Sequence, residues 1–405
     1  MTEVDSTADI CEWARGFHLY NPEVQQDPYP WFARLRQECP VARSDQAGGF
    51  WVISRYPDLL FIFQHPELFS NAEQTIPHVE DPMGSLIPSM VDPPDHTAYR
   101  KILSPSFVPA AIKKMEPTVR ARAAALLEPI AEKGGCDFLR DFAVPLPCSA
   151  FAEMMGLPAA DLPMLLEWKE EALHAGLNPE PGAIEAALMG VRSKIISYFQ
   201  DMYSNRAKLD DPGEDLVGVL VKGQFKGERP LTVNEFLRTC YLLFVAGLDT
   251  VTGQLSMAVT RLGRDLALRD ELTTDPSLIA SAVEELMRYD STVNLARKVT
   301  ADVEVGGVQM KRGDKVLLLM TSGSRDEQQF PGADEIDIRR FPNQHFGFGA
   351  GRHRCIGSHL ARMELTVALE EMHRLIPGYR VDETKPARRH LEYTAGYDQL
   401  HLVVD

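Results

Sequence analysis

A glycine-punctuated loop near the end of the chain limits its possible folds more than any other segment. Residues 346–357 read Phe-Gly-Phe-Gly-Ala-Gly-Arg-His-Arg-Cys-Ile-Gly, so Cys355 follows two arginines and lies at the expected start of a helix. Glycine can take positive φ, which lets a backbone approach a flat group closely. A helix N-terminus and nearby cations favour a thiolate over a thiol. The loop therefore predicts a ligating thiolate beside a flat cofactor.

Taken alone, Cys355 has simpler interpretations. Isolated cysteines are more often small buried apolar residues, and a glycine-rich loop can be a tight turn or an anion-binding nest. The complete pattern Phe-x-x-Gly-x-x-x-Cys-x-Gly, with His353 two places before the cysteine, favours a ligand. In this pattern the sequence strongly resembles the cytochrome P450 family, and the resemblance extends over nearly the whole chain. It implies that Cys355 is the axial thiolate of heme b (iron protoporphyrin IX), which Phe348, Gly349 and Gly357 contact.

The composition is that of a large globular chain, in which we expect neither a signal peptide nor a membrane anchor. The chain has 405 residues, 44% of them apolar, which is enough for a sizeable core and a buried cofactor. Its first residues lack both a basic region and an apolar stretch, and no later window approaches about 20 uninterrupted apolar residues. We expect a soluble, cytoplasmic protein without a membrane partner.

The cysteines and the net charge narrow the possible classes of protein. The six cysteines show no C-x-x-C spacing, which argues against a zinc ribbon, a thioredoxin-type pair and covalent haem attachment. They are Cys11, Cys39, Cys136, Cys148, Cys240 and Cys355. We expect them to be reduced thiols in a reducing compartment. The formal net charge of −16 disfavours nucleic acid and anionic membranes as partners.

No repeat or linker divides the chain, and residues 204–215 are expected to join two helices rather than two domains. Residue periodicity predicts helices over 110–131, 162–175, 184–203 and 233–264, and strands over 50–53, 303–305, 315–320 and 401–404. The predicted fold class is mainly α with a small, largely antiparallel β region. The resemblance implies a single cytochrome P450 domain over residues 1–405, a triangular prism with haem between a long central helix and the cysteine-loop helix.

The predicted central helix, residues 233–264, opens with a capping box. Thr232 is its expected N-cap, and Glu235 reaches back to the N-cap backbone. About thirty residues at a rise of 1.5 Å span roughly 45 Å, which is long enough to cross a domain of this size.

The middle of this helix contains residues that disfavour helix formation. It contains Ala246, Gly247, Asp249 and Thr250, and a glycine inside a helix costs about 1 kcal/mol relative to alanine. A close helix crossing would explain an Ala-Gly pair alone, but the sequence Ala-Gly-x-Asp-Thr is more specific. The resemblance implies that the helix bulges over the haem here, with Ala246 and Gly247 against it. Thr250 would hydrogen-bond the bound oxygen, and Asp249 would relay protons from solvent.

Glu285 and Arg288 stand one helical turn apart and can form an ion pair. On a surface, such a pair contributes at most a few tenths of a kcal/mol, on the order expected for exposed pairs. The resemblance implies instead a buried structural network of Glu285, Arg288 and Arg340, in which the loss of one member would strand a charge.

Residues 92–100 begin a helix after two prolines and place a histidine and an arginine on one face. Such a pair is usually part of a solvated face, but this string resembles the propionate-binding segment of the family. The resemblance implies four propionate ligands, with Lys298 as an alternative to the third: His96, Arg100, Arg297 and His353.

The positions that match the substrate pocket of the family are mostly apolar, although any one of them alone is more often plain core. They are Leu86, Ile87, Leu242, Val245, Val293, Leu295 and Thr394. Together they imply a dry pocket that binds a small lipophilic molecule by burial, at about 25 cal/mol per Å². Residues 162–200, interrupted at 176–182, resemble the two helices and mobile connection of the entrance lid.

No flavin or nicotinamide fingerprint accompanies the loop, so electrons must come from another protein. The resemblance to soluble bacterial, camphor-hydroxylating members implies an iron-sulfur ferredoxin with its NAD(P)H-dependent reductase. Six basic residues are candidates for steering this acidic partner: Arg100, Lys101, Lys113, Lys114, Arg352 and Arg354.

These features lead us to expect a monooxygenase that hydroxylates a small lipophilic, for example terpenoid, substrate with O2. Two alternatives are a peroxygenase and a non-catalytic haem sensor or carrier. The intact Asp249 and Thr250 pair argues against the first, since a peroxygenase does not require a proton relay. A non-catalytic haem sensor or carrier would need neither the proton relay nor the lipophilic pocket.

Overall fold

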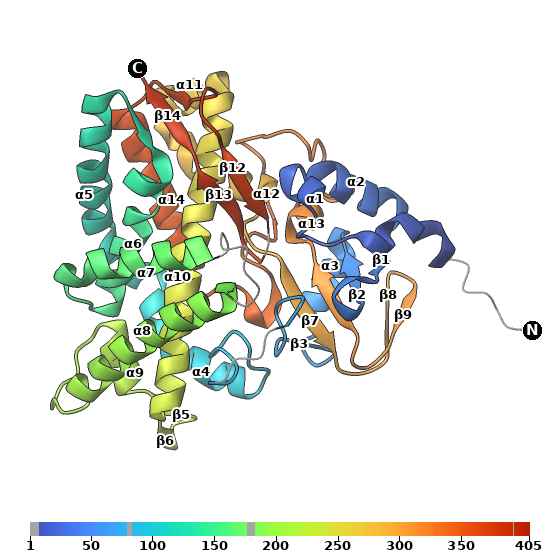
Figure 1. Ribbon diagram of the computed structural model, residues 1–405, viewed down its shortest axis with the longest axis horizontal. Coiled ribbons are helices and arrows are strands. Elements are labelled where there is room, and N and C mark those ends of the chain that lie inside the picture. The colour runs from blue at the N-terminus through green and yellow to red at the C-terminus, as the bar shows by residue number, and fades with distance from the viewer. Residues whose placement is uncertain (1–7, 79–82, 176–182, 392) are drawn as a thin grey trace, which may run out of the picture. The chain divides into compact units, whose positions relative to one another are not determined.

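The computed structural model describes residues 8–78, 83–175, 183–391 and 393–405 (Figure 1). These residues belong to two compact units, each assembled from stretches that lie far apart in the sequence. Unit 1 is Met1–Glu80, Ala280–Cys355 and Arg388–Tyr397, and unit 2 is Asp81–Ile279, Ile356–Ala387 and Asp398–Asp405. The predicted fold class, mainly α with a small β region, is confirmed. A single domain over all 405 residues stays a prediction.

Unit 1 is built on a five-stranded sheet. Its order is β1 (Val41–Ser44), β2 (Phe50–Ile53), β10 (Lys315–Leu318), β7 (Leu295–Val299) and β3 (Phe69–Ser70). Strand β10 pairs in parallel with β2, and the other neighbours are antiparallel. The strand predicted over 315–320 ends at Leu318, because Met320 already begins α13 (Met320–Ser324).

A hairpin and several helices complete unit 1. Strands β8 (Val303–Val305) and β9 (Val308–Met310) are joined by two glycines with positive φ. The helical elements are η1 (Ala8–Gly16), α1 (Pro22–Gln26), α2 (Tyr29–Glu38), η2 (Gln46–Gly48), α3 (Tyr56–Gln64), α12 (Ile279–Tyr289), α13 and η7 (Gly351–His353). Tyr56 stacks on Phe346 with ring centroids 4.5 Å apart, and Phe346 is fully buried. This stacking anchors the stretch before the cysteine loop in the core of the unit.

Unit 2 is organised around the long helix α10 (Val233–Arg264), whose bounds agree with the sequence prediction. The Thr232 hydroxyl accepts a hydrogen bond from Glu235 N at 3.2 Å, and the Glu235 carboxylate accepts one from Thr232 N at 2.7 Å. The capping box is therefore confirmed. Arg229 and Tyr99 also bind this carboxylate, and the hydrogen bond from Arg229 is the main cause that lowers the pKa of Glu235.

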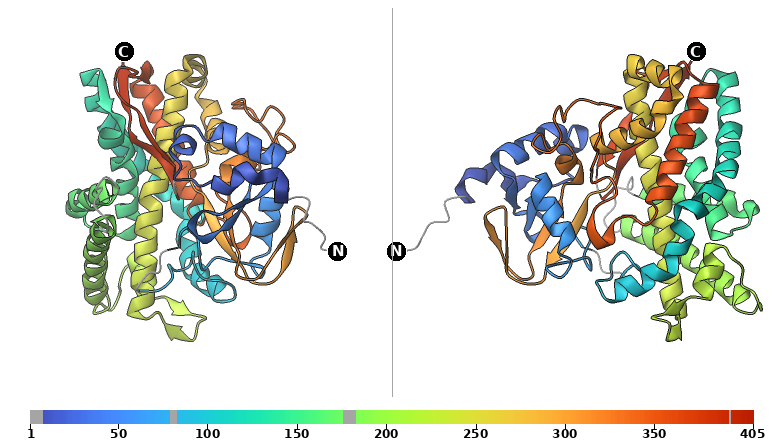
Figure 2. Two further views of the ribbon diagram at one scale, coloured as in Figure 1. Left: turned by 45° about the vertical axis from the view of Figure 1, so that its right-hand side comes forward. Right: turned by 180° about the vertical axis from the view of Figure 1, so that it is seen from behind.

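Helices α5 (Pro109–Lys133) and α14 (Ser358–Leu375) lie side by side in unit 2, as Figures 1 and 2 show. Proline occupies the first turn of α5, and Gly134 ends it with a left-handed φ of 70°. Arg120 of α5 joins the two helices through Glu370 at 2.6 Å and Glu371 at 3.1 Å. The same unit contains α4 (Asp95–Leu103), η3 (Ser104–Phe107), η4 (Leu139–Ala143), α6 (Pro145–Met155), η5 (Ala159–Asp161), α7 (Leu162–Ala175), α8 (Ala183–Arg206), α9 (Leu216–Val221), α11 (Leu266–Thr274) and η6 (Pro276–Leu278).

The remaining strands form small sheets. Strands β11 (Tyr379–Val381), β14 (His401–Val404) and β4 (Gly135–Asp137) form one sheet, β5 (Gln224–Phe225) pairs with β6 (Arg229–Pro230), and β12 (Arg388–Leu391) pairs with β13 (Ala395–Gln399). The other predicted helices and strands are confirmed within three residues. Residues 204–215 do join two helices, and Asp215 is the N-cap of α9.

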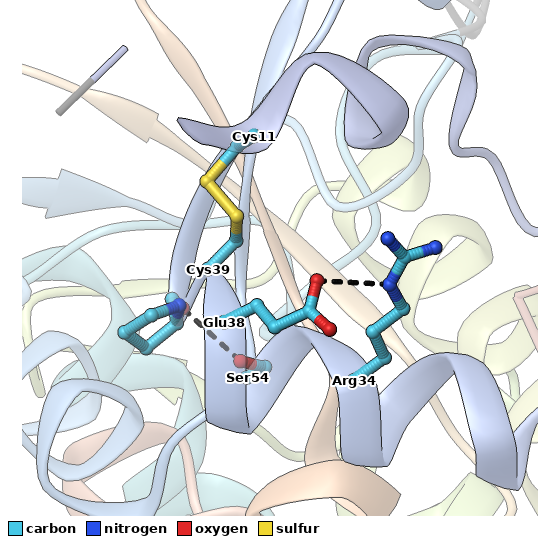
Figure 3. Close-up of a disulfide and its surroundings, with 6 residues drawn as sticks. Cys11, Arg34, Glu38, Cys39 and Ser54 are labelled. Carbon is cyan, nitrogen blue, oxygen red and sulfur yellow. Dashed lines mark hydrogen bonds and ion pairs between the residues drawn. A yellow bond between two sulfur atoms is a disulfide. The ribbon is translucent and has the colours of Figure 1, made fainter. Parts of the chain in front are cut away.

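A disulfide between Cys11 and Cys39 contradicts the expectation that all six cysteines are reduced thiols (Figure 3). It ties η1 to the residue that follows α2, and the two Cα atoms lie 5.9 Å apart. Around it, Arg34 stacks over the Trp13 ring at 4.0 Å and pairs with Glu38 at 2.9 Å. The sequence could not predict this pair, because the two cysteines are separated by 28 positions and meet only through the packing of η1.

One helix among the described residues, α10, is long and apolar enough to cross a membrane by length and composition. However, 61% of its most apolar window is buried within the protein, which is the behaviour of a core helix.

Candidate active site

The cysteine loop is held in unit 1 by its own backbone. Cys355 N donates a hydrogen bond to Phe348 O at 2.9 Å, and Gly349 N donates to Phe346 O at 2.7 Å. Gly349 and Gly351 have φ values of 63° and 67°, which a side chain would strain. At Gly351 an added Cβ would also collide with the backbone oxygen of Phe63. These glycines are therefore required for the loop to pass so close to α3.

The side chain of Cys355 is exposed, unlike those of the other cysteines outside the disulfide. Burial raises the pKa of the Cys148 thiol to about 11 and that of Cys136 to about 12, and it raises that of Cys240 well above its usual value. Those three thiols are thus poor ligands, because a thiolate is the species that binds metal. Cys355 is the accessible sulfur, and Arg352 and Arg354 stand just before it.

The described residues could hold a metal that is already bound in a macrocycle better than they could hold a bare metal ion. Nowhere in them do three or more His, Cys, Asp or Glu side chains gather as a metal site. A porphyrin supplies four nitrogen ligands itself, so one accessible cysteine sulfur suffices to hold its iron. The donor set of the loop therefore fits haem.

Arg297 and Lys298 occupy different environments on β7. Arg297 is 3% exposed and lies 5.7 Å from the Phe63 ring, whereas Lys298 is half-buried and pairs with Glu73 at 2.6 Å. Because Lys298 is neutralised by Glu73, Arg297 is the better candidate for a cofactor propionate. His353 lies in η7 of the same unit.

Tyr393 was not singled out by the sequence. Its backbone oxygen accepts a hydrogen bond from Asn294 N at 3.0 Å, beside the bridge that pairs Val293 with Thr394. Burial raises the pKa of the Tyr393 phenol, and the charges of Arg297 and Cys355 also act on it. The position of Tyr393 next to Thr394 was the only available signal.

In unit 2, His96 and Arg100 lie on α4 as predicted, and His96 is 2% exposed. The structure places Leu86 and Ile87 before this helix, and Ile87 is buried. Residues 176–182 of the predicted entrance lid lie outside the described residues.

The middle of α10 presents one accessible stripe. Leu242, Val245, Ala246 and Asp249 follow helical spacing, and Val245 is 40% exposed although it is apolar. Phe244 and Leu248, on the other side of the helix, are buried. Exposed apolar side chains in the middle of a core helix could be buried by a lipophilic ligand or a cofactor that binds there.

The bulge that the resemblance implies is not present in α10, all of whose residues are described. The segment around Gly247 is α-helical without interruption, and the Thr250 hydroxyl donates a hydrogen bond to Ala246 O at 2.8 Å. This hydroxyl bond satisfies the second lone pair of a helical carbonyl and needs no widening of the helix.

Lys169 is a second residue that the sequence analysis missed. Its ammonium lies 3.5 Å from the Asp249 carboxylate, and its side chain is 5% exposed against 40% for Asp249. One signal was available, because Lys169 continues the apolar stripe of α7 at four and seven positions after Leu165 and Leu162.

The structure brings Glu285, Arg288 and Arg340 together in unit 1. Arg288 makes two hydrogen bonds to the Glu285 carboxylate at 2.7 and 2.8 Å, and both side chains are fully buried. Arg340 Nε lies 3.1 Å from the same carboxylate, and Asn343 Nδ2 lies 3.0 Å from it. Arg288 also binds the backbone oxygens of three residues between 324 and 335, which shapes the stretch that leads to the cysteine loop.

Comparison with known proteins agrees with this geometry. A family model described as Cytochrome P450 matches residues 46–375. The chain is 31% identical to Linalool 8-monooxygenase of Pseudomonas putida, over 95% of this chain and 98% of that protein. It is 33% identical to Cytochrome P450-terp of a Pseudomonas species, over 85% and 86% of the two chains.

A solved structure gives the same result for the fold. The crystal structure of CYP101J2 matches with a TM-score of 0.84 and 31% identity, and the match covers 96% of both chains. With the accessible cysteine at the end of its glycine loop, the chain therefore belongs to the cytochrome P450 family and is a monooxygenase of the haem-thiolate type.

Proposed function

We propose that the protein is a soluble, cytoplasmic monooxygenase that inserts one atom of O2 into a C–H bond of a small lipophilic substrate. The observation that supports this most directly is the accessible sulfur of Cys355. It follows a loop in which Gly349 and Gly351 have positive φ and no side chains, so that a flat cofactor could approach the backbone closely. The sulfur of Cys355 would hold heme b, and this cofactor would supply the oxidising chemistry, since a thiolate ligand pushes electron density onto iron and favours O–O cleavage.

The residues that would hold this cofactor fall into two groups. One group would lie against the flat faces of the macrocycle: Phe348, Gly349, Gly357, Ala246 and Gly247. The other would bind its propionates: His96, Arg100, Arg297 and His353. The burial of Arg297, together with the neutralisation of Lys298 by Glu73, supports this choice.

Asp249 and Thr250 would deliver protons to the oxygen-binding side. The Asp249 side chain is 40% exposed, so it can exchange protons with solvent. It would pass a proton to the hydroxyl oxygen of Thr250, which gives up its own proton in turn. The Thr250 hydroxyl has this capacity because it donates only to Ala246 O and keeps a lone pair for an incoming proton.

A terpenoid is the substrate class that we infer. The pocket candidates are apolar, and two similar proteins are named for linalool and as P450-terp. Val293 and Thr394 are adjacent across a β-bridge, and Leu295 lies two residues further along the chain. Leu86, Ile87, Leu242 and Val245 would complete the apolar lining. Adding linalool and related compounds to the oxidised protein tests this, because displacement of an iron-bound water shifts the Soret band.

The electron donor that we propose is an iron-sulfur ferredoxin with its NAD(P)H-dependent reductase. Exposed cations would attract an acidic partner despite the net charge of −16. They are Lys113 and Lys114 on α5, and Arg352 and Arg354 before the cysteine. Lys101 and Arg100 on α4 add to this set. A rate of electron transfer that does not fall with added salt would argue against electrostatic docking.

The ligand assignment is tested by spectroscopy. We expect the reduced protein with carbon monoxide to show the red-shifted Soret band of thiolate ligation. Cys355→Ala should lose this band, while Cys136→Ala, the matched control in unit 2, should keep it. A histidine-type spectrum of the unaltered protein would overturn the assignment.

A further inference from the structure

Arg238 on α10 binds the backbone of residues 83–91, the segment that precedes α4. Its Nε donates a hydrogen bond to Ser85 O at 2.5 Å. Its guanidinium also lies over Gly84, where an added Cβ would come within 3.4 Å of Arg238 Cζ. Gly84 has a φ of 93°, which residues with a side chain rarely adopt. The glycine therefore lets the guanidinium approach the backbone of this segment closely.

Both partners of this contact adjoin residues of the proposed substrate pocket. Leu86 follows Ser85 directly in the chain. On α10, Leu242 and Val245 lie four and seven positions after Arg238, which places all three on one face of the helix. All of these residues belong to unit 2. One charge-assisted hydrogen bond thus joins two segments that would line the pocket.

The hydrogen bonds within residues 83–91 do not set the distance of this segment from α10. Met90 N donates to Leu86 O at 2.8 Å, and Val91 N donates to Pro88 O at 3.2 Å. These bonds are local, so they fix the shape of the turn but not its place. The bond from Arg238 is different, because it connects the segment to a helix that is packed in the core of unit 2.

We propose that Arg238 is a specificity-determining residue, which positions one wall of the substrate pocket and so limits the length of the molecules that fit. The inference rests on the proposed function, since it presupposes a lipophilic substrate between these segments. The bond keeps the wall that bears Leu86 and Ile87 at a fixed distance from α10. A compact terpenoid of about ten carbons is enclosed, whereas a homologue longer by one isoprene unit meets the wall.

Binding of two probes that differ only in length tests this role. Linalool and nerolidol carry the same tertiary allylic alcohol, and nerolidol is longer by one isoprene unit. Each is titrated into the oxidised, haem-loaded protein, and its Kd is measured from the Soret shift. For Arg238→Gln we expect the ratio of the nerolidol Kd to the linalool Kd to fall by about 5-fold or more, because specificity is a difference between two affinities.

Three further variants separate the contact from charge and from general stability. Arg238→Lys keeps the charge but not the planar donor, so it should restore only part of the ratio. Gly84→Ala disturbs the same contact from the other side, and it should lower the ratio even if Arg238→Gln does not fold. Arg264→Gln is the matched control at the end of the same helix, where Arg264 forms an exposed pair with Glu383, and it should leave the ratio unchanged.

Hydrogen exchange tests the contact without any substrate. In the haem-loaded protein, we expect Arg238→Gln to speed the exchange of the Met90 and Val91 amides by about 10-fold or more, because the segment opens locally. The amides of α5 should exchange as they do in the unaltered protein. An equal increase in both regions would show a general loss of stability and would overturn the positioning role.

An unchanged ratio of the two Kd values in Arg238→Gln would also overturn the proposal. This failure is distinguishable from a failure of the proposed function. If linalool shifts the Soret band of the unaltered protein and the ratio stays the same in the variant, only the role of Arg238 is contradicted. If neither probe shifts the band of the unaltered protein, the terpenoid assignment is contradicted, and the exchange rates decide whether Arg238 holds the segment.

Discussion

Tyr29, the first residue of α2, donates a hydrogen bond through its phenol to the carboxylate of Asp290, which follows α12. Arg325 lies between the rings of Tyr29 and Tyr289, at 4.1 and 4.0 Å from their centroids. Arg389 donates to the Tyr29 oxygen at 3.1 Å. These residues join four separate segments of unit 1 through one buried carboxyl group.

This carboxyl group should make stability depend on pH. Burial raises the pKa of Asp290 from 3.8 to about 6, although Arg389 and Arg325 act in the opposite direction. Because the folded protein holds the proton more tightly, the stability from this group is complete below about pH 4 and is lost as the pH rises through 6. Relative to Asp290→Asn, we expect the unaltered protein to lose about 3 kcal/mol of unfolding free energy between pH 4 and 7. Urea unfolding at several pH values measures this, and a constant difference would contradict it. The exposed Asp210→Asn is the control.

The Glu285 network should respond strongly to the loss of one charge. Glu285→Gln leaves the guanidinium of Arg288 fully buried without its carboxylate, so we expect a loss of about 3 kcal/mol or more. Glu383→Gln removes an exposed pair with Arg264 and should cost less than about 1 kcal/mol. Chemical unfolding of the haem-loaded proteins measures both. Equal effects of the two substitutions would mean that burial of the network does not matter.

Thr250→Ala should separate electron use from product formation. With linalool as the probe and a ferredoxin system, we expect NADH consumption to continue while peroxide exceeds product, because the relay loses its hydroxyl. Thr274→Ala is a matched control, since Thr274 makes the same hydroxyl bond to the carbonyl four residues earlier, at 2.8 Å, on α11. Unchanged coupling of NADH to product in Thr250→Ala would remove this residue from the mechanism.

The Cys11 and Cys39 disulfide should stabilise unit 1. It closes a separation of 28 residues, for which the chain-entropy relation gives about 3.5 kcal/mol. We expect Cys11→Ser and Cys39→Ser to lower the unfolding free energy by similar amounts, and a reducing agent to have the same effect on the unaltered protein only. Thiol titration of the denatured, unreduced chain should find four thiols. Six would show that the bond does not form.

Local signals in the sequence predicted the elements that depend on neighbouring residues. The capping box of Thr232 predicted where α10 begins, because hydrogen bonds within four residues decide the start of a helix. The apolar period predicted how far the helix continues. The strand predicted from Lys315 was too long, because apolar residues continue through Met320 and only the turn into α13 ends the strand. Residue type alone does not encode that turn.

Features that depend on distant segments were missed or left open. The partner of Cys11 follows from how η1 packs against α2, and the partner of Lys169 follows from how α7 crosses α10. The choice between Arg297 and Lys298 also needed the structure, because successive residues of a strand face opposite sides and only one of them meets Glu73. Sequence patterns name the candidate residues, but the partners of a side chain depend on tertiary packing.

The parallel pairing of β2 with β10 has a consequence for biosynthesis. Strand β2 ends at Ile53 and its neighbour begins at Lys315, so the first leaves the ribosome long before the second exists. At 5–20 residues per second the wait is roughly 15 to 50 s, during which that edge remains open to other chains. Nascent unit 1 is therefore a natural client for chaperones, because its sheet stays incomplete until Lys315–Leu318 has been synthesised. Cofactor loading through Cys355 must come later still, because this residue follows β10 in the chain.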